Sequence, residues 1–591
     1  MRTISENAKL IAEKRYLKID KDGTPKENID EMFQRIAKYI AKAEKIDKSS
    51  KSMQTKVEED FYYILKDRKF TSGMVMLDRG RENILAACYV LPLKDSIESI
   101  YTTLLNSVQL HRRGAGIGYD FSAIRPEGNF VKTTGKKASG PVSFMRLYDF
   151  SSEEIMNKGA VRHAGHMGIL RIDHPDIMRF IKAKTDMNEL NNFNISIAVT
   201  DEFYDSYKNN KTFELKWPVS DEFEYNSDKR ALKVYEELNP REMIDDIAKR
   251  IHKSAEPGFI FIDKVNKFNP TPNVGLMTAT NQCGEQPLLP YEACNLGNID
   301  LSKYFTNGEF DWDDLKFTVE TAVRFLDNTI TMTNHLLPEI NNIVAKGNRK
   351  IGLGVMGLAD LFYLMDIPYE SKKARETAEE IMKFIWENAA DASSKLGKEK
   401  GSFGNFKDSK WDESSNVEQA KQNPRRYKTM RNATVTTIAP TGTTALFADC
   451  NGGIEPFYAL SYKRMNMETM GENTEMIYTN DILTKRLKSD WLYNKELDAE
   501  IFEKGSLRGI DSLPEKIRKV FVTAKDIDAK DHVLMQSVFQ KWTDNAVSKT
   551  INMPSNATVE QIIEIFELAY ETDCKGLTIY RDKSRDKQVL N

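Results

Sequence analysis

Three side chains with complementary chemistry lie two residues apart in the segment Asn281-Gln-Cys283-Gly-Glu285. In an extended backbone, residues two apart project to the same side, so the carboxamide, thiol and carboxylate could face one substrate. A second cysteine, Cys294, follows eleven residues after the first. Zinc sites favour close pairs such as C-x-x-C or H-x-x-x-H, and the chain contains neither. The spacing therefore favours redox chemistry on a polar substrate over zinc binding.

A lone cysteine more often packs in a protein core as a small hydrophobic residue. The neighbours of Cys283 are Asn, Gln, Gly and Glu, which are poor company for a core side chain. The local sequence therefore favours a functional thiol.

A second chemical signal is the stretch Thr436-Thr-Ile-Ala-Pro440-Thr-Gly-Thr-Thr444-Ala-Leu-Phe. Its pattern predicts a strand, a loop of Pro, Gly and Thr, and then a helix. Free N–H groups at a helix start favour an anion, but the loop lacks the GK[ST] ending of a Walker motif. A threonine-rich helix cap without a ligand remains an open alternative.

A third signal is Arg112-Arg113-Gly114-Ala-Gly116-Ile-Gly118. Glycines at spacing two resemble a dinucleotide-binding loop, but the full spacing and the downstream acid of that motif are missing. The favoured interpretation is a tight turn between packed elements.

Composition excludes several classes of protein. The 591 residues carry a net charge of −3, without a long Lys/Arg cluster, so no nucleic-acid partner is expected. Five cysteines are too few for a secreted disulfide scaffold. The N-terminus lacks a signal-peptide core, and the least polar stretch, 351–365, contains Asp360 and is too short to span a bilayer. We expect a soluble cytoplasmic protein without membrane contact.

The elements that must position these residues can be read in outline. An apolar stripe predicts a helix over 27–46, with Thr24-Pro25 as its start, and a helical region over residues 1–70. Strands are expected at 195–199, 258–263, 433–438 and 577–580. Thr558 and Gln561 predict a capping box for a helix over 558–570, with Gly576 as its stop. This alternation indicates an α/β protein with parallel strands; with no internal repeat or linker visible, we expect one catalytic domain over 71–591.

Taken in order, these segments resemble the catalytic subunit of ribonucleotide reductase, specifically its adenosylcobalamin-dependent (class II) branch. The resemblance covers nearly the whole chain. Two residues depart from the family pattern: Gln282 stands where Pro is usual, and His166 where Asn is usual. Further matching segments are Ala87-Cys88-Tyr-Val-Leu-Pro, Ala138-Ser-Gly-Pro-Val-Ser143-Phe-Met, Met167-Gly-Ile-Leu-Arg-Ile-Asp-His-Pro-Asp176, Thr543-Asp-Asn-Ala-Val-Ser-Lys-Thr-Ile-Asn552 and Leu577-Thr-Ile-Tyr-Arg-Asp582.

The resemblance implies a ten-stranded α/β barrel of two five-stranded parallel halves, with Cys283 on a finger loop inside it. Cys283 would be the thiyl-radical residue that takes the 3′ hydrogen of the ribose. Glu285 would accept the 3′-hydroxyl proton, and Asn281 would hydrogen-bond the sugar hydroxyls. Cys88 and Cys294 would supply two electrons as the 2′-hydroxyl leaves as water, and would end as a disulfide.

The same resemblance implies sites for nucleotides. The substrate phosphates would be held by Pro440, Thr441, Gly442, Thr443 and Thr444, with Ser72, Ala87 and Gly116 lining the site. A deoxynucleotide effector would bind at Asp95, Ser96 and Arg125 at a homodimer interface, and a loop with Lys158 and Arg162 would relay its identity to the substrate site. The N-terminal region shows no match to the ATP-binding module that controls overall activity in other members.

The radical source is expected to be adenosylcobalamin, with no protein ligand to its cobalt and no other metal. Members with a separate metal-containing radical subunit carry adjacent tyrosines in the C-terminal strand, whereas this chain has only Tyr580 there. The pair Tyr62-Tyr63 lies in an expected helix, where packing explains it. The alternatives are a catalytic subunit that uses such a metal partner, and a nucleotide-binding regulatory protein that has lost the chemistry.

Diphosphate substrates are expected. The sequence after Leu577 shows no cysteine pair of the kind that re-reduces the active-site disulfide in many members. Small thiols, or a redoxin acting from outside, are therefore the expected reductants. Cys450 and Cys574 are expected to be structural.

Overall fold

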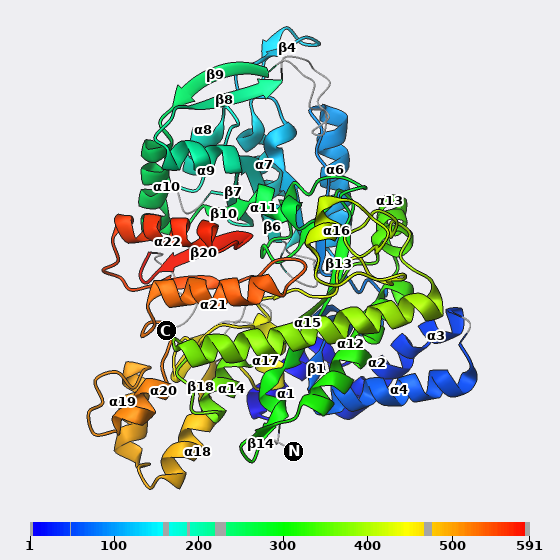
Figure 1. Cartoon of the computed structure of the whole chain (residues 1–591), viewed down its shortest axis with the longest axis vertical. Helices are drawn as coiled ribbons and strands as arrows, with labels where there is room; N and C mark the ends of the chain where they lie inside the picture. Colours follow the sequence, from blue (N-terminus) through cyan, green and yellow to red (C-terminus); the bar gives the residue numbers. More distant parts are fainter. Residues whose placement is uncertain are drawn as a thin grey trace.

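The computed structural model describes residues 4–47, 49–157, 163, 165–185, 189–218, 232–465 and 475–584. The chain begins with a helical region that packs on the long helix α12 (Figure 1). Its helices are α1 (Glu6–Ile11), the π-helical turn η1 (Ala12–Tyr16), α2 (Ile29–Ala41), α3 (Ala43–Ile46) and α4 (Lys51–Lys66).

The expected first helix is present, but it begins later than the sequence indicated. Asn28 accepts from the backbone of Glu31, and the Glu31 carboxylate accepts from the backbone of Asn28. This reciprocal capping box starts α2 at Ile29, so Thr24-Pro25 is not its start signal. The buried face of α2 carries the predicted stripe of Met32, Phe33, Ile36 and Ile40.

Five parallel strands form the first half of the barrel, in the order β2-β3-β6-β7-β10. Helices follow most of them and cover their outer side in the upper part of Figure 1. The strands are β2 (Cys88–Val90), β3 (Gly116–Asp120), β6 (Gly165–Arg171), β7 (Phe193–Val199) and β10 (Gly258–Phe261). The helices are α6 (Ile97–His111), α7 (Pro141–Ser151), α8 (Ile177–Lys182), α9 (Asp201–Lys208), α10 (Pro240–Ser254) and α11 (Ile262–Lys267).

The second half also consists of five parallel members. Strands β13 (Ala293–Asp300) and β16 (Ile351–Met356) pair in parallel, as do β19 (Thr550–Met553) and β20 (Gly576–Arg581). Between these pairs runs the extended segment 434–438, which is held by single parallel bridges, Leu353↔Thr436 and Ile438↔Val547. The expected strand at 433–438 is therefore extended but lacks a continuous ladder.

The two halves meet antiparallel at both seams. Strand β13 pairs with β2, and β20 pairs with β10. With segment 434–438 bridging β16 to the residues just before β19, the ten members surround one interior. The fold is the ten-stranded α/β barrel of two five-stranded parallel halves, preceded by a helical region, that the family resemblance implied.

Helices cover the second half and flank its strands. Helix α15 crosses the width of the molecule in Figure 1, next to α12 and α21. The helices here are α12 (Trp312–Met332), α14 (Leu358–Leu364), α15 (Lys372–Lys400), α16 (Glu418–Gln422), α17 (Gly442–Ala448), α21 (Ala529–Lys541) and α22 (Val559–Glu571). A small lobe with its own apolar cluster adds α18 (Asp481–Ser489), α19 (Lys495–Lys504) and α20 (Glu515–Val520).

The remaining elements are short or peripheral. They are β1 (Phe70–Thr71), α5 (Gly73–Leu77), η2 (Phe121–Ala123), β4 (Phe130–Val131), β5 (Lys136–Lys137), η3 (Ser152–Met156), β8 (Phe213–Pro218), β9 (Leu232–Leu238), β11 (Ala279–Thr280), β12 (Pro287–Leu288), η4 (Leu301–Tyr304), β14 (Phe305–Thr306), β15 (Glu309–Phe310), α13 (Pro338–Ile340), η5 (Asn341–Asn348), β17 (Ser461–Met465) and β18 (Glu475–Thr479).

Two of the predicted element boundaries, at α22 and β10, were wrong in detail. Helix α22 has the predicted capping box of Thr558 and Gln561, but it ends at Glu571, and Gly576 opens β20 instead of stopping the helix. Strand β10 ends at Phe261, because α11 begins at the next residue.

The glycines at 116 and 118 do not form the expected turn, which is confined to Gly114 (φ +89°). They lie in β3, on the face toward the barrel interior. A Cβ on Gly118 would lie 1.6 Å from the backbone oxygen of Thr280. These glycines therefore let another segment pass close against the strand.

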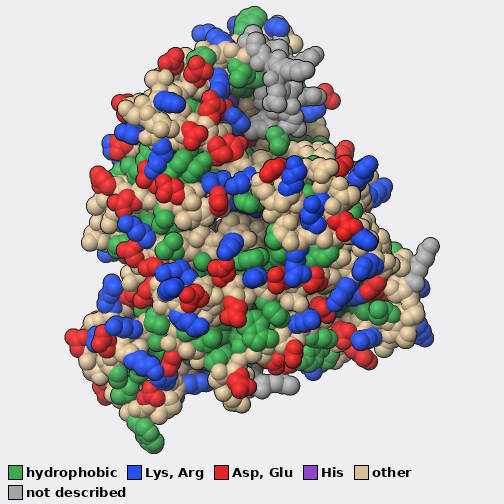
Figure 2. Space-filling view, viewed as in Figure 1, with side chains coloured by type: hydrophobic (Ala, Val, Ile, Leu, Met, Phe, Trp, Pro, Cys, Tyr) green, Lys and Arg blue, Asp and Glu red, His purple; other side chains and the backbone are tan. Residues whose placement is uncertain are grey.

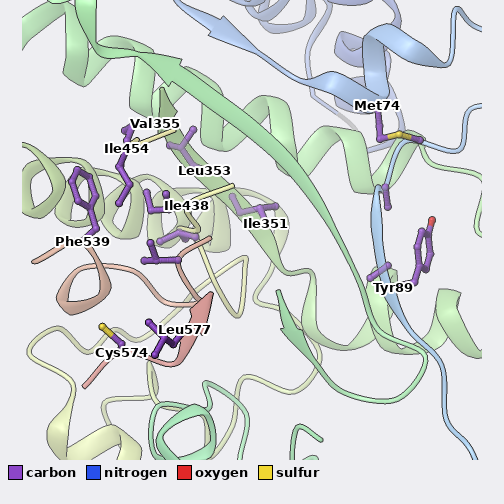
Figure 3. Packing of buried hydrophobic residues seen from close by; sticks show 14 of the residues in the cluster. Met74, Tyr89, Ile351, Leu353, Val355, Ile438, Ile454, Phe539, Cys574 and Leu577 are labelled. Atoms are coloured by element: carbon purple, nitrogen blue, oxygen red, sulfur yellow. The ribbon is translucent and has the colours of Figure 1, made fainter. Parts of the chain in front are cut away.

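Strand β16 repeats this arrangement in the other half. A Cβ on Gly354 would lie 2.4 Å from the backbone oxygen of Thr437, and one on Gly352 would lie 2.6 Å from its Cγ2. On the opposite face, Ile351, Leu353 and Val355 follow one another along the strand as a buried apolar row (Figure 3). The apolar face of β16 thus packs in the hydrophobic core, and its glycine face leaves room for Thr437.

The surface agrees with the balanced charge. On the face in Figure 2, acidic and basic side chains are interspersed. None of the helices in the described ranges is both long and apolar enough to cross a bilayer.

Candidate active site

The finger loop enters the barrel between β11 and β12, which pair antiparallel. Its tip is closed by two hydrogen bonds between Asn281 and Gln286: the backbone N–H of Asn281 donates to the Gln286 oxygen (3.1 Å), and that of Gln286 donates to Asn281 Oδ1 (3.0 Å). Gly284 turns the chain at φ +80°. Asn281 and Glu285 are buried as a result, whereas Cys283 is partly exposed.

Both halves of the barrel hold this loop. Asn194 of β7 donates to the Gln282 backbone oxygen (2.8 Å). On the other side, the backbone oxygen of Glu285 accepts from Thr437 Oγ1 (2.9 Å) and from the backbone N–H of Ala546 (3.0 Å). The tip is therefore fixed across the interior.

Cys88 and Cys294 face each other directly across the seam between β2 and β13. Residues paired in an antiparallel ladder have Cα atoms about 4.5–5.5 Å apart. Disulfides need about 4.4–6.8 Å, so the backbone separation at this pair is within the range for a bond between the two thiols. Both are free thiols in this structure.

The finger loop brings its functional groups to this seam. Asn281 Nδ2 donates to Cys88 Sγ (3.1 Å), and the Cys88 thiol lies 3.8 Å from Glu285 Oε1. Burial raises the pKa of the Cys88 thiol well above its usual value, and the nearby Glu285, Cys283 and Cys294 raise it further. Three thiols, a carboxyl group and a carboxamide thus share one site, and Cys88 is a neutral thiol at physiological pH.

Cys294 lies next to a buried ion pair that was not predicted from the sequence. Its thiol lies 3.7 Å from the Lys350 backbone oxygen, and the Lys350 ammonium contacts Glu292 at 2.7 Å with both side chains fully buried. Burial raises the pKa of Cys294, the Lys350 charge opposes this, and Glu292 and Glu285 add to it. The position of Lys350, directly before the apolar strand β16, was the sequence signal that this charge lies inside the protein.

The threonine-rich loop has the expected form, in which Pro440 and Thr441 (φ +52°) lead into α17 at Gly442. Thr441 Oγ1 accepts from the Gly453 backbone N–H (2.7 Å), and Thr443 Oγ1 accepts from Arg15 Nη1 (2.9 Å). A Cβ on Gly442 would meet no atom within 4 Å. The loop is therefore held by its hydroxyls and open at its glycine.

The other residues expected to line the substrate site lie at two places. A Cβ on Gly73 would lie 3.1 Å from Thr444 Cγ2, which puts neighbouring Ser72 near the threonine loop. Ala87 accepts from the Gly116 backbone N–H (2.8 Å), which puts both residues beside Cys88. The Thr444 hydroxyl itself donates within the loop, to the Thr441 oxygen (3.2 Å).

A cavity of about 250 Å³ connects the finger loop with the threonine loop, because Cys283 and Pro440 both line it. Strand β20 contributes only Gly576, Leu577 and Thr578 to its wall. Residues with polar side chains on its lining are Asn194, Ser196, Glu256, Gln282, Gln536, Ser548, Lys549, Thr550 and Thr578.

Lys549 was also missed by the sequence analysis. It is buried, and its Nζ contacts Glu455 Oε2 (2.5 Å) and His532 Nδ1 (3.0 Å). Burial lowers the pKa of Lys549, and Glu455 partly offsets this. The motif around it was visible in the sequence, but the burial of its ammonium against Glu455 and His532 depends on the fold.

The proposed effector residues lie together at the start of α6. Asp95 forms an ion pair with Arg125 (2.6 Å) and accepts from the Arg125 backbone, while Ser96 caps the helix. Lys158 and Arg162 lie outside the described residues, as do residues 585–591 at the C-terminus.

The remaining cysteines lie away from this site, Cys574 among apolar residues and Cys450 between an apolar cluster and the carboxylates of Asp300 and Asp360. Cys574 is fully buried, and burial raises its pKa to about 12. Cys450 packs against the apolar cluster of Met356, Ala445 and Ala448. Tyr62 and Tyr63 lie on α4, and their hydroxyls donate to Asp30 and Asp314, respectively. These contacts give both residues a structural role.

Comparison with known proteins agrees with this architecture. The family model described as ribonucleotide reductase, barrel domain, matches residues 86–580, and the one described as ribonucleotide reductase, all-alpha domain, matches residues 2–73. The chain belongs to the ribonucleotide reductase family.

Its relatives point to one branch of that family. The vitamin B12-dependent ribonucleoside-diphosphate reductase of Thermoplasma acidophilum is 38% identical over 99% of this chain and 80% of its own length. The enzyme of the same name from Mycobacterium tuberculosis is 38% identical over 100% of this chain and 81% of its own length. The solved class Id ribonucleotide reductase alpha subunit of Actinobacillus ureae covers 99% of this chain and 98% of its own with a TM-score of 0.76. At 19% identity, that likeness shows the fold alone.

Proposed function

We propose that this protein reduces ribonucleoside diphosphates to 2′-deoxyribonucleotides, with adenosylcobalamin as the radical source. The observation that carries the proposal is the direct pairing of Cys88 with Cys294 beside Asn281, Cys283 and Glu285. The names of the relatives at 38% identity support both the diphosphate substrate and the cofactor.

The proposed reaction divides the work among these side chains. Cys283, as a thiyl radical, takes the 3′ hydrogen of the ribose, and Glu285 accepts the 3′-hydroxyl proton while Asn281 binds the hydroxyls. The 2′-hydroxyl leaves as water, and Cys88 and Cys294 together give up two electrons and two protons as one S–S bond forms. One of the two protons leaves with the 2′-hydroxyl as water, and the other ends as the new hydrogen on C2′. Glu285 returns its proton to the 3′ oxygen and Cys283 returns its hydrogen to C3′, so the reaction balances and the thiyl radical is regenerated.

The burial of the two thiols supports this assignment. The raised pKa of Cys88 keeps its proton in place at neutral pH, so it can deliver a proton to the departing hydroxyl. A carboxylate in reach of the same site suits general acid–base catalysis. Glu285 lies within hydrogen-bonding reach of the Cys88 thiol, so that a proton can pass between them.

The cavity beside Cys283 fits the adenosyl part of the cofactor. No large side chain of β20 fills it, and Asn194, Ser196 and Glu256 offer polar contacts to a nucleoside. A Cβ on Gly284 would meet nothing within 4 Å, which leaves the side of the loop next to Cys283 open. Adenosylcobalamin would supply the radical chemistry there, while the protein supplies position and exclusion of water.

The nucleotide sites and partners complete the proposal. The loop from Pro440 to Thr444 would bind the substrate phosphates, with the open Gly442 as the point of close approach. A deoxynucleotide effector would bind near the Asp95–Arg125 pair at a homodimer interface, which would make substrate choice allosteric. Small thiols or a redoxin would reduce the disulfide.

The deciding experiment combines the purified protein with a nucleoside diphosphate, adenosylcobalamin and dithiothreitol. We expect deoxynucleotide without a second protein. Product that requires an added metal-containing subunit would support the class I-type alternative. Nucleotide binding without product under either condition would support a regulatory protein.

Cys283→Ser tests the radical residue directly. We expect less than about one hundredth of wild-type turnover, since a hydroxyl cannot carry the radical, with nucleotide affinity nearly unchanged. Cys574→Ala provides the control for loss of a thiol elsewhere, and it should remain active. More activity than this in Cys283→Ser would exclude the role.

A further inference from the structure

The Gln282 side chain fills a notch made by two glycines on neighbouring strands. Gly116 of β3 and Gly165 of β6 are paired in register. A Cβ on Gly116 would lie 0.9 Å from Gln282 Oε1, and one on Gly165 would lie 3.0 Å from its Cδ and Nε2. The amide thus occupies the space that two missing side chains leave.

The same residue is also held by its backbone. Its carbonyl oxygen accepts from Asn194 Nδ2 on β7 (2.8 Å). Gln282 therefore contacts three consecutive strands of the first half, and Cys283 is its immediate neighbour. Displacement of this residue would move the thiol.

The oxygen of this amide gains no hydrogen bond from its position. Within the described residues, Oε1 is buried and has no hydrogen-bond partner. Leaving a buried polar atom unpaired costs free energy, so the shape of the side chain must account for its position. Proline, the usual residue here in the family, restrains the backbone through its ring, and a glutamine supplies no such restraint.

We propose that Gln282 is the positioning residue of the Cys283 thiol, acting as a peg in the Gly116–Gly165 notch. This inference rests on the proposed function only for its catalytic consequence. The position of the thiol can be measured without turnover.

The test compares Gln282→Ala, which empties the notch, with Gln282→Met, which keeps its length without an amide. The first readout is the rate at which iodoacetamide alkylates Cys283 in the cofactor-free protein, followed by mass spectrometry. We expect about tenfold faster alkylation in Gln282→Ala and a rate within about threefold of wild type in Gln282→Met. In turnover, Gln282→Ala should lower kcat by about 10–100-fold with KM nearly unchanged, because small displacements of a reacting group have effects of this size.

A reciprocal pair of variants tests the notch itself. In Gly116→Ala the new Cβ collides with the amide, so we expect faster alkylation of Cys283. Gly116→Ala combined with Gln282→Ala should return that rate toward wild type, because the new methyl group takes the vacated space. Gly118→Ala is the matched control: its Cβ collides with the Thr280 backbone, so removing the Gln282 side chain should not relieve it.

Each outcome decides a different question. Three results would each overturn the role of Gln282 as a peg. They are alkylation of Gln282→Ala at the wild-type rate, a loss of kcat in Gln282→Met equal to that in Gln282→Ala, and no return of the alkylation rate toward wild type in the double variant. The predicted alkylation pattern in a protein that makes no deoxynucleotide would retain the peg and reject the proposed function. If the wild type makes deoxynucleotide but no Gln282 variant changes the alkylation rate or kcat, the peg is rejected and the proposed function is retained.

Discussion

The two halves of the barrel begin in the same way. The first opens with Cys88 on β2, next to β3 with its inward-facing Gly116 and Gly118. The second opens with Cys294 on β13, next to β16 with Gly352 and Gly354. Each half therefore contributes one thiol and one strand with a bare inner face.

The halves differ in what those glycines admit and in how their strands are joined. In the first half, the glycines of β3 admit the finger loop at Thr280 and Gln282, and continuous ladders join all five strands. In the second, the glycines of β16 admit Thr437, on the extended segment that leads to the threonine loop, and Gly352 also admits the Gln286 side chain at the base of the finger loop. The glycines of both halves thus make room for the finger loop, and those of β16 also make room for the segment that leads to the threonine loop.

The largest expected effect comes from breaking the symmetry of the two thiols. Cys88→Ser and Cys294→Ser each remove one half of a single two-electron reductant, so either should reduce sustained turnover with dithiothreitol below about one hundredth of wild type. Alkylation and mass spectrometry after turnover without reductant should find the Cys88–Cys294 disulfide in the wild type. Sustained activity in one variant but not the other would contradict the equal roles of the halves.

A smaller loss is expected where the halves meet at Glu285, whose backbone is bonded to the second half and whose side chain reaches Cys88 of the first. Glu285→Gln keeps the shape and removes the base, so kcat should fall by about 10²–10⁴-fold. Thr437→Val removes the hydroxyl contacts to the backbone oxygens of Glu285 and Ala546 and should cost less than about tenfold. If the ranking were reversed, the loop's attachment to the second half would matter more than the carboxylate.

The two glycine faces can be compared through stability. Gly118→Ala would place a Cβ 1.6 Å from a backbone oxygen and Gly354→Ala would place one at 2.4 Å. Such overpacking costs about 1–3 kcal/mol or more in unfolding free energy, and Gly118→Ala should lower the melting temperature further. Gly442→Ala, which meets no atom within 4 Å, is the control and should not be destabilised. Equal melting temperatures for all three would mean that neither face is tightly occupied.

The smallest effect concerns acid stability, which should differ between the buried histidines and the buried Asp327. Burial lowers the pKa of His111 and of His174, in the first half, to about 4. Because these groups are neutral when folded and protonated when unfolded, stability falls as pH drops from about 6.5 to 4. In the second half, burial would raise the pKa of Asp327, but Arg349 and Arg431 lower it to about 2. Its stabilisation is present above about pH 4 and is lost as pH falls toward 2.

Hydrogen exchange at pH 7 and pH 5, corrected for intrinsic rates, can separate these windows. Peptides from α6 and β3 should lose protection at pH 5, by on the order of 2 kcal/mol for a histidine shifted this far. Second-half peptides that contain His335 or His532, whose pKa values burial also lowers, should lose protection too, while those from β16 should not. His111→Gln, which cannot be protonated, should reduce the loss. Uniform loss across both halves would show that they open as one unit.

The sequence revealed chemistry wherever the relevant groups are local. Asn281, Cys283 and Glu285 were visible because residues two apart share one side of a short loop. The pairing of Cys88 with Cys294 was not derivable from spacing, and came from family resemblance alone. It requires two strands from different halves to meet in one register, and a single sequence contains no information about that register.

Other features were misread for physical reasons. The Gly116-Ile-Gly118 pattern was assigned to a turn because glycine's freedom of φ is its commonest use, whereas here its lack of a side chain is what matters. The similarity of the two halves could not be recognised as a sequence repeat. It consists only of the direction of the strands and the placement of one cysteine and two glycines in each half. Lys350 and Lys549 were missed because their burial depends on partners far along the chain, Glu292 and Glu455.

The position of the cysteines on opposite sides of a seam also has a mechanical consequence. A disulfide between Cys88 and Cys294 would staple the two halves together and enclose about two hundred residues of chain, for which the chain-entropy account gives on the order of 5 kcal/mol. Each catalytic cycle would then alternate between a looser reduced barrel and a covalently locked oxidised one. The heat resistance of the resting enzyme would serve as a gauge of its redox state, with reductant lowering the temperature at which it unfolds.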